Sequence, residues 1–148
     1  MIQLLFLILT LFLSCTQGIH DIELSDIEGN KVYLSEYRDK PLVVYVWSGT
    51  CIGHTEDMKR LITLYPKIKD KAQLISIAVM MNPQDVKVFL KKTKIKPNYE
   101  ILSDEKGKFA QRVTLVFLPA TLIFDKKGKL VESYPGLPRD LISLIPTH

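Results

Sequence analysis

Residues 42–54 read LVVYVWSGTCIGH, and this stretch is the strongest indication of the fold in the sequence. Its first six residues are apolar and rich in β-branched and aromatic side chains, which is typical of a strand buried on both faces of a parallel sheet. From about His54 the spacing of apolar residues becomes helical. Cys51 therefore stands in a loop between a buried strand and a helix. In α/β proteins the loops at the carboxyl ends of parallel strands are where sites form.

The chain beyond this stretch repeats the alternation of strands and helices. Asn82-Pro83 is typical of a helix start, because Asn caps well and Pro suits the first helical position. Pro66 should end or kink the helix that begins near His54. The alternation predicts an α/β fold, with a mixed central sheet flanked by helices and an N-terminal β-hairpin extension. Further strands are expected at residues 74–79, 99–102, 120–124 and 130–134, the hairpin within 21–34, and shorter helices at 109–113 and 139–144.

The first residues look like a processing signal. Met1–Leu13 is almost wholly apolar, but it is shorter than the ~20 residues that a membrane helix needs. A small residue followed by Cys15 then resembles a bacterial lipoprotein signal, in which Cys15 would be acylated; plain cleavage after Gly18 is the alternative. We expect residues 1–18 to be the signal region and residues 19–148 to form one domain. Both alternatives place the domain outside the cytoplasm, on the periplasmic side, and the lipoprotein alternative anchors it to the membrane.

Composition and charge argue against a nucleic-acid-binding protein and limit what the cysteines can do. The net charge is +4 and the lysines are scattered, with no interleaving of arginine and aromatic residues, so we expect no nucleic-acid partner. One domain of this size buries a core without disulfides or metals. The sequence contains two cysteines, and Cys15 is either lipidated or removed. Cys51 is then a single unpaired thiol, which is unusual in an oxidising compartment.

Three segments, in order, resemble the thioredoxin superfamily, and more narrowly its AhpC/TSA-related, membrane-tethered redoxins of the TlpA and ResA type. Residues 43–54 resemble the strand, Trp and Cys-x-x-Cys motif of that family. Residues 118–125 (LPATLIFD) resemble its cis-proline and following strand, and residues 27–35 (IEGNKVYLS) its entry hairpin. The resemblance covers residues 22–144 and implies a thioredoxin fold.

This sequence departs from the family pattern at the motif itself. His54 replaces the second cysteine, so the motif reads Cys-x-x-His. Tyr45 stands where the family often has a buried acidic or amide residue, and Lys59 lies near the position of its helix-bending proline. A dithiol cycle is therefore excluded, and release of a mixed disulfide requires an outside thiol.

The resemblance implies thiol-disulfide chemistry through Cys51. A cysteine at a helix N-terminus is favoured as thiolate by the unpaired N–H groups and the helix dipole. His54, one turn on, would act as an electrostatic partner or accept the thiol proton. The resemblance implies that Leu118 and Pro119 dock the substrate backbone. Trp47 is included as a substrate-binding residue, although its place in an apolar strand favours a core position. Protein thiols or disulfides are the expected partners, with no cofactor and no metal.

Three alternatives remain open from the sequence. One is a degenerate, non-catalytic binding domain, in which Cys51 is only a small residue and His54 is a solvated helix residue. Another is a one-cysteine peroxidase, for which Ser48 is suitably placed, while Val44 occupies the position of the required proline. The third is a copper-handling module built from Cys51, His54 and the Met80-Met81 pair, since soft ligands suit Cu(I).

Overall fold

The computed structural model describes residues 18–50 and 53–147. Cys15 and Cys51 therefore lie outside the described residues. The helical elements are η1 (a 3-10 helix, Leu34–Tyr37), α1 (His54–Ile68), α2 (Pro83–Thr93), α3 (Lys108–Arg112) and α4 (Leu141–Leu144). The strands are β1 (Glu23–Asp26), β2 (Lys31–Tyr33), β3 (Leu42–Trp47), β4 (Gln73–Val79), β5 (Glu100–Asp104), β6 (Ala120–Phe124) and β7 (Leu130–Pro135).

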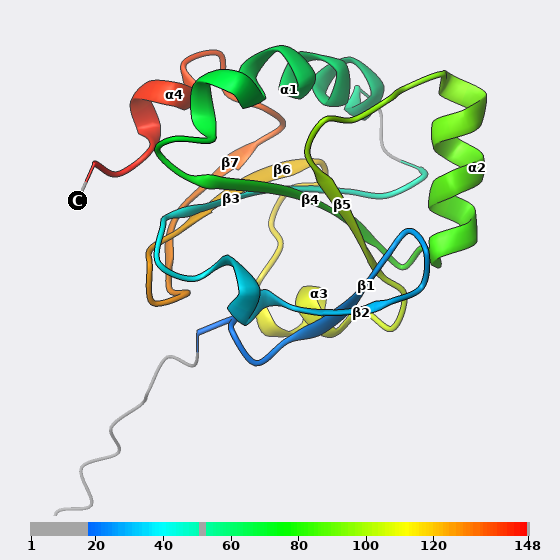
Figure 1. Cartoon of the computed structure of the whole chain (residues 1–148), viewed down its shortest axis with the longest axis horizontal. Helices are drawn as coiled ribbons and strands as arrows, with labels where there is room; N and C mark the ends of the chain where they lie inside the picture. The colour runs from blue at the N-terminus through cyan, green and yellow to red at the C-terminus, as the bar shows by residue number, and fades with distance from the viewer. Residues whose placement is uncertain (1–17, 51–52, 148) are drawn as a thin grey trace, which may run out of the picture.

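The strands form one mixed sheet in the order β2-β1-β5-β4-β3-β6-β7 (Figure 1). β3, β4 and β5 are parallel, and β6, β7 and the β1–β2 hairpin join them antiparallel. One face of the sheet packs against α1, α2 and α4, and the other against η1, α3 and the entry segment. The predicted mixed sheet with helices on both faces and an N-terminal hairpin is confirmed.

β3 is the central strand that leads to the candidate site. All six of its residues are buried. Because side chains alternate along a strand, Val43, Tyr45 and Trp47 enter the core under α1 and α2, whereas Val44 and Val46 enter the core on the opposite face. The continuous apolar run thus reflects a strand covered on both sides, and it places Trp47 at the carboxyl end of the strand, immediately before residues 48–50.

From the sequence, Pro66 is predicted to end or kink the first helix. It does not end the helix, because α1 continues to Ile68. Proline lacks the N–H that the carbonyl of Ile62, four residues earlier, would accept. The side-chain amide of Asn98 donates to this carbonyl at 3.0 Å. A residue from another part of the chain therefore supplies the missing donor, and the backbone turns helically past the proline.

Other boundaries follow from caps and pairing. Asn82 accepts a hydrogen bond from the N–H of Asp85 at 2.8 Å, which confirms the predicted helix start. β5 ends at Asp104 rather than residue 102, because it pairs with β4 as far as Val79. α4 begins at Leu141 rather than residue 139, because Ser143 folds back on the carbonyl of Asp140 in a turn.

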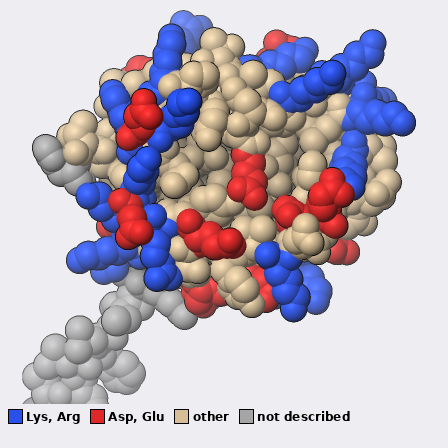
Figure 2. All heavy atoms as spheres, in the orientation of Figure 1, with Lys and Arg blue, Asp and Glu red and all other residues tan. Residues whose placement is uncertain are grey.

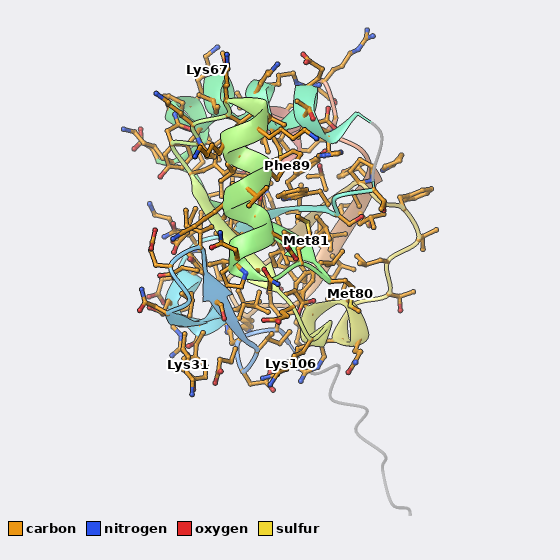
Figure 3. All side chains as sticks on the ribbon, turned by 90° about the vertical axis from the view of Figure 1, so that its right-hand side faces the viewer. Lys31, Lys67, Met80, Met81, Phe89 and Lys106 are labelled. Carbon is orange, nitrogen blue, oxygen red and sulfur yellow. The ribbon has the colours of Figure 1, made fainter. Side chains whose placement is uncertain are left out.

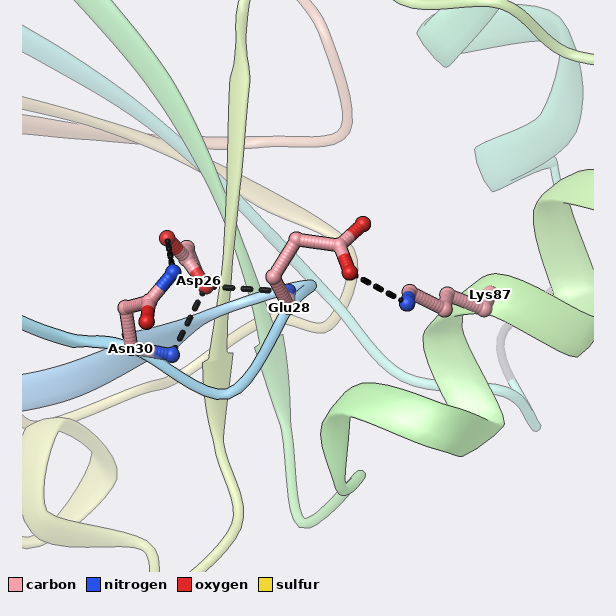
Figure 4. Close-up of polar contacts among 4 residues, drawn as sticks. All are labelled: Asp26, Glu28, Asn30 and Lys87. Carbon is pink, nitrogen blue, oxygen red and sulfur yellow. Dashed lines mark hydrogen bonds and ion pairs between the residues drawn. The ribbon is translucent and has the colours of Figure 1, made fainter.

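The N-terminal hairpin is tied to the sheet and to α2 (Figure 4). In its turn the carboxylate of Asp26 accepts the N–H groups of Glu28 and Asn30, both at 2.9 Å. These hydrogen bonds, those from Asn30 foremost, lower the pKa of Asp26. Glu28 pairs with Lys87 of α2 at 2.7 Å. In the described part of the chain, no helix has the length and apolar character needed to cross a membrane.

Candidate active site at the carboxyl end of the sheet

The carboxyl ends of β3 and β4 meet the start of β6 at one end of the sheet (right in Figure 1). Trp47 pairs with Ala78 there, and Val46 pairs with Ala120. The chain then passes through Ser48–Thr50 and the undescribed residues 51 and 52 to Gly53, which precedes α1 with a φ of +86°. This left-handed conformation suits glycine. In the sequence Cys51 stands between this loop and the first residue of α1.

His54, the first residue of α1, lies in a cluster of aromatic rings. Its ring stacks on Trp47 with centroids 5.4 Å apart and 12° between the planes, and it contacts Phe89 of α2 at 5.1 Å. Trp47 and Phe89 also contact each other, with centroids 4.8 Å apart. Only 6% of His54 is exposed. The alternative of a solvated helix residue is therefore wrong, because α2 covers the ring.

Both ring nitrogens of His54 are buried without a hydrogen-bond partner among the described residues. An unsatisfied buried polar atom costs about 1–3 kcal/mol, so each such atom requires an explanation. A neutral imidazole offers one donor and one acceptor. Within the described residues, the ring nitrogens thus remain available to a group outside that part of the chain or to a bound partner.

Trp47 has a supporting role. None of its surface is exposed, and its indole N–H donates to the hydroxyl of Ser76 at 2.9 Å. A fully buried side chain offers no surface to a substrate. In this structure Trp47 therefore belongs to the core, where it supports the His54 ring from beneath, and its expected role in substrate binding is not available to it.

A carboxylate on α1 that the sequence analysis missed binds a side chain of β3. The hydroxyl of Tyr45 donates to Asp57 of α1 at 2.8 Å. Asp57 follows His54 by three residues, so the i, i+3 spacing was the available signal. Tyr45 occupies the position on β3 at which the family often has a buried acidic or amide residue, and the carboxylate here belongs to Asp57 of the helix α1. Tyr99 also binds α1 through the carbonyl of Met58, and burial raises the pKa of this tyrosine.

Leu118 and Pro119 lie at the same end of the sheet, immediately before β6. Their peptide bond is cis, as the resemblance implied. The carbonyl of Pro119 accepts the N–H of Gly136, which connects this turn to the end of β7. The residues before it are apolar and exposed, with exposed fractions of 73% for Val116, 44% for Phe117 and 43% for Leu118. The segment therefore presents an apolar surface beside the site.

The side chains of the two adjacent methionines of the copper alternative have different neighbours (Figure 3). A Cβ built on Gly49 would meet the sulfur of Met81 at 3.7 Å, so Met81 packs against the site loop. Met80 is 71% exposed, and its sulfur lies against Gly107. Among the described residues no group of three or more His, Cys, Asp or Glu side chains is arranged to hold a metal ion. The structure thus brings Met81 near the site and leaves Met80 outside it.

The peroxidase alternative gains little from the surroundings of the loop. Val44 is fully buried in β3, and the hydroxyl of Ser48 shares a hydrogen bond with that of Thr50 at 3.1 Å. In the part of the chain that is described, Arg60 donates to the carbonyls of Leu137 and Pro138, and Arg112 pairs with Asp21. The hydrogen bonds of these arginines are therefore made to groups away from the loop.

The mixed sheet and the cis-proline immediately before β6 are those of a thioredoxin-fold redoxin of the TlpA and ResA type. Residues 16–133 match the AhpC/TSA family, and the chain belongs to that family. The thiol-disulfide oxidoreductase ResA of Bacillus thuringiensis subsp. konkukian is 26% identical over 113 residues, which cover 76% of this chain. The chain spans 64% of the length of that relative.

Solved structures share the fold. The exposed lipoprotein thioredoxin Etrx1 of Streptococcus pneumoniae superposes with a TM-score of 0.72 at 22% identity, over 84% of this chain and 95% of its own. A thiol:disulfide interchange protein DsbE of Chlorobium tepidum gives a TM-score of 0.72 at 18% identity, over 85% and 88% of the two chains. These likenesses confirm the thioredoxin fold that the sequence predicted.

Proposed function

We propose that this protein is an extracytoplasmic thiol-disulfide oxidoreductase that acts through Cys51 as its single nucleophile. The observation that carries the proposal is the buried His54 imidazole at the start of α1, three residues after Cys51 in the chain, whose two nitrogens have no hydrogen-bond partner among the described residues. Membership of the AhpC/TSA family and the similarity to ResA proteins support the same chemistry.

In the proposed first step, the Cys51 thiolate attacks one sulfur of a partner's disulfide. A mixed disulfide forms, the partner's S–S bond breaks, and its second sulfur leaves as a thiolate that takes up a proton from water. The amino end of α1 favours the attacking thiolate, and a His54 ring N–H adds a hydrogen bond to it. Because this motif contains no second cysteine, an outside thiolate then attacks the partner's sulfur in the mixed disulfide. A disulfide between the partner and the outside thiol forms, the bond to Cys51 breaks, and Cys51 leaves as a thiolate.

Substrate docking is assigned to the segment before β6. Leu118 and the two residues before it are exposed and apolar, and Pro119 lies half-buried beneath them. An apolar surface beside a nucleophile suits an extended, apolar stretch of a partner protein. We assign Leu118 and Pro119 to this contact, and Trp47 to the support of His54.

The pH dependence of alkylation tests the role of the His54–Cys51 pair. With both the helix start and the imidazole acting on it, Cys51 should reach half-maximal alkylation below about pH 8.5, the pKa of a free cysteine. His54→Phe preserves ring packing on Trp47 and Phe89 but removes both nitrogens, so its midpoint should lie at higher pH. The measurement is the iodoacetamide rate from pH 5 to 10 in the Cys15→Ser background, in which Cys51 is the sole thiol.

Thermal unfolding of the same variants is the control. His54→Phe should unfold at or above the temperature of the parent chain, because it replaces unpaired buried nitrogens by carbon. A shifted alkylation profile in a stable variant is then a chemical effect of the imidazole. If Cys51 alkylates like a free cysteine and His54→Phe leaves the profile unchanged, the proposed pair is refuted.

We further propose that residues 1–18 direct the chain out of the cytoplasm and that Cys15 carries a lipid. Cys15→Ser should move the protein from the membrane fraction to the soluble extracytoplasmic fraction, since the acyl chains are its anchor. Fractionation with an antibody measures this, and Cys51→Ser is the matched control that should remain with the membrane. A wild-type chain already soluble, with its mature N-terminus at Ile19, would show plain cleavage after Gly18 instead.

A further inference from the structure

The described chain enters the domain at a fixed point. Arg112 donates to the carbonyl of Gly18 at 2.8 Å, and the N–H of Ile19 donates to the carbonyl of Gly128 at 3.0 Å. A Cβ on Gly18 would lie 3.0 Å from the carbonyl oxygen of Lys127, so the two backbones pack closely here. Residues 1–17 therefore join the domain at the turn between β6 and β7.

This entry point lies at the end of the sheet opposite the candidate active site (Figure 1). The first residue of β3, Leu42, pairs with Phe124 beside the β6–β7 turn, whereas its last residue, Trp47, lies under His54. A six-residue strand spans about 16 Å at roughly 3.3 Å per residue. A tether attached at Gly18 thus holds the domain by the end remote from Trp47 and His54.

Basic side chains, with acidic ones among them, lie near the entry point (Figure 2, left edge). One groove is lined by Lys71 and Lys126 together with Asp39 and Asp70, and another by Ile19, Lys129 and Leu130. The neighbouring edge strand β7 adds two exposed aliphatic residues. We call this surface the entry face; its exposed basic and aliphatic members are Lys69, Lys71, Lys126, Lys127, Lys129, Leu130 and Val131, and Asp39 and Asp70 are exposed beside them.

We propose that the entry face rests on the anionic lipid surface of the membrane, with the candidate active site directed away from it. This inference rests on the proposed anchoring through residues 1–18. Lysines are attracted to anionic headgroups, and aliphatic side chains beside them enter the boundary between headgroups and acyl chains. The point at which the chain joins the domain decides between the two ends of the molecule, because the tether keeps only this face close to the bilayer.

A second group of lysines provides an internal comparison. Lys91, Lys92 and Lys94 are exposed at the end of α2, whose Phe89 packs on Trp47 and His54 at the active-site end. These lysines resemble those of the entry face in charge and exposure but have no chain entry beside them. Attraction to anionic lipid alone would draw both groups of lysines toward a membrane. A tether at Gly18 instead brings only the entry face close to the bilayer.

Lysine acetylation of the full chain on vesicles tests the orientation. The membrane-extracted protein is reconstituted into vesicles of phosphatidylcholine with a quarter phosphatidylglycerol, or into phosphatidylcholine alone, and floated on a density gradient. Acetylation at each lysine is then followed by mass spectrometry. On anionic vesicles Lys126, Lys127 and Lys129 should react about threefold or more slowly than in detergent, with little change at Lys91, Lys92 and Lys94.

Charge reversal supplies the matched variants. The triple variant K126E/K127E/K129E should lose the protection at Lys69 and Lys71, whereas K91E/K92E/K94E should retain it. Equal reactivity at both groups, or protection confined to the end of α2, overturns the inference. Acetylation of Lys126, Lys127 and Lys129 that is slow in detergent and no slower on anionic vesicles would assign the face to a second copy of the chain and overturn the inference as well.

Flotation separates this inference from the proposals on which it rests. A chain that floats but is evenly acetylated remains anchored, and only its orientation is refuted. A chain that does not float refutes the anchor and the orientation together. Neither result changes the alkylation profile of Cys51, so the thiol chemistry is judged independently.

Discussion

The Cys51→Ser variant will lose every mixed disulfide that the wild-type chain forms with partner proteins. In wild type these adducts should persist until an added thiol releases them, because the motif has no second cysteine to attack the bond. A hydroxyl in place of the thiol cannot form a disulfide, so the expected loss is complete. The measurement is a non-reducing gel of acid-quenched cells expressing either chain, with and without dithiothreitol.

Cys15→Ser is the control for the other cysteine of the sequence. It should retain the adducts of Cys51, although a changed location would alter which partners are trapped. The circular dichroism spectrum and melting temperature of Cys51→Ser should match those of wild type. Adducts that survive in Cys51→Ser would assign the chemistry elsewhere, and a wild-type chain that traps nothing would favour a binding domain without thiol chemistry.

Restoring the second thiol should produce the largest gain. In His54→Cys the introduced thiolate can attack the Cys51 sulfur of a mixed disulfide. An internal disulfide then forms, the partner leaves as a dithiol, and the trapped adduct disappears without added thiol. The lifetime of the adduct should fall by orders of magnitude, since an intramolecular attack has a very high effective concentration. Adducts with a disulfide-containing model peptide, followed over time by mass spectrometry, measure this.

His54→Ser is the matched control, because it also removes the imidazole but supplies no thiol. Its adducts should last as long as those of wild type. If His54→Cys adducts persist equally, the thiol at position 54 cannot reach Cys51 and the motif has lost the family geometry. An excess of dithiothreitol should regenerate the reduced His54→Cys chain, which confirms that only an external reductant is then needed.

Patterns among neighbouring residues were sufficient for most of the fold. The apolar runs predicted β3 and β6 with their observed ends, and Asn82-Pro83 predicted the start of α2. The cis bond before Pro119 followed from the resemblance. These features depend on local chemistry: the pleat alternates side chains, an Asn oxygen meets the N–H three residues on, and a family motif lies within a few positions.

The surroundings of His54 were decided by tertiary structure. The sequence placed His54 three residues after Cys51, but it left open whether the ring is solvated. Phe89 lies 35 positions further along the chain, and only the packing of α2 beside α1 brings its ring over the imidazole. The bond between Tyr45 and Asp57 likewise joins a strand to a helix. Such contacts depend on how elements dock, which the periodicity within each element does not specify.

The course of α1 and the orientation of the domain likewise depend partly on local sequence and partly on tertiary contacts. From the sequence alone it follows that Pro66 has no backbone N–H to donate within the helix. Only the tertiary structure shows that the side-chain amide of Asn98 donates to the carbonyl of Ile62 in its place. The sequence also determined that an apolar segment precedes the domain. That this segment joins the end opposite the candidate site was decided by the pairing of β3 with β6 and by the contact of Ile19 with Gly128. Local rules act over a few residues, whereas the close packing of a core unites groups that are far apart in the chain.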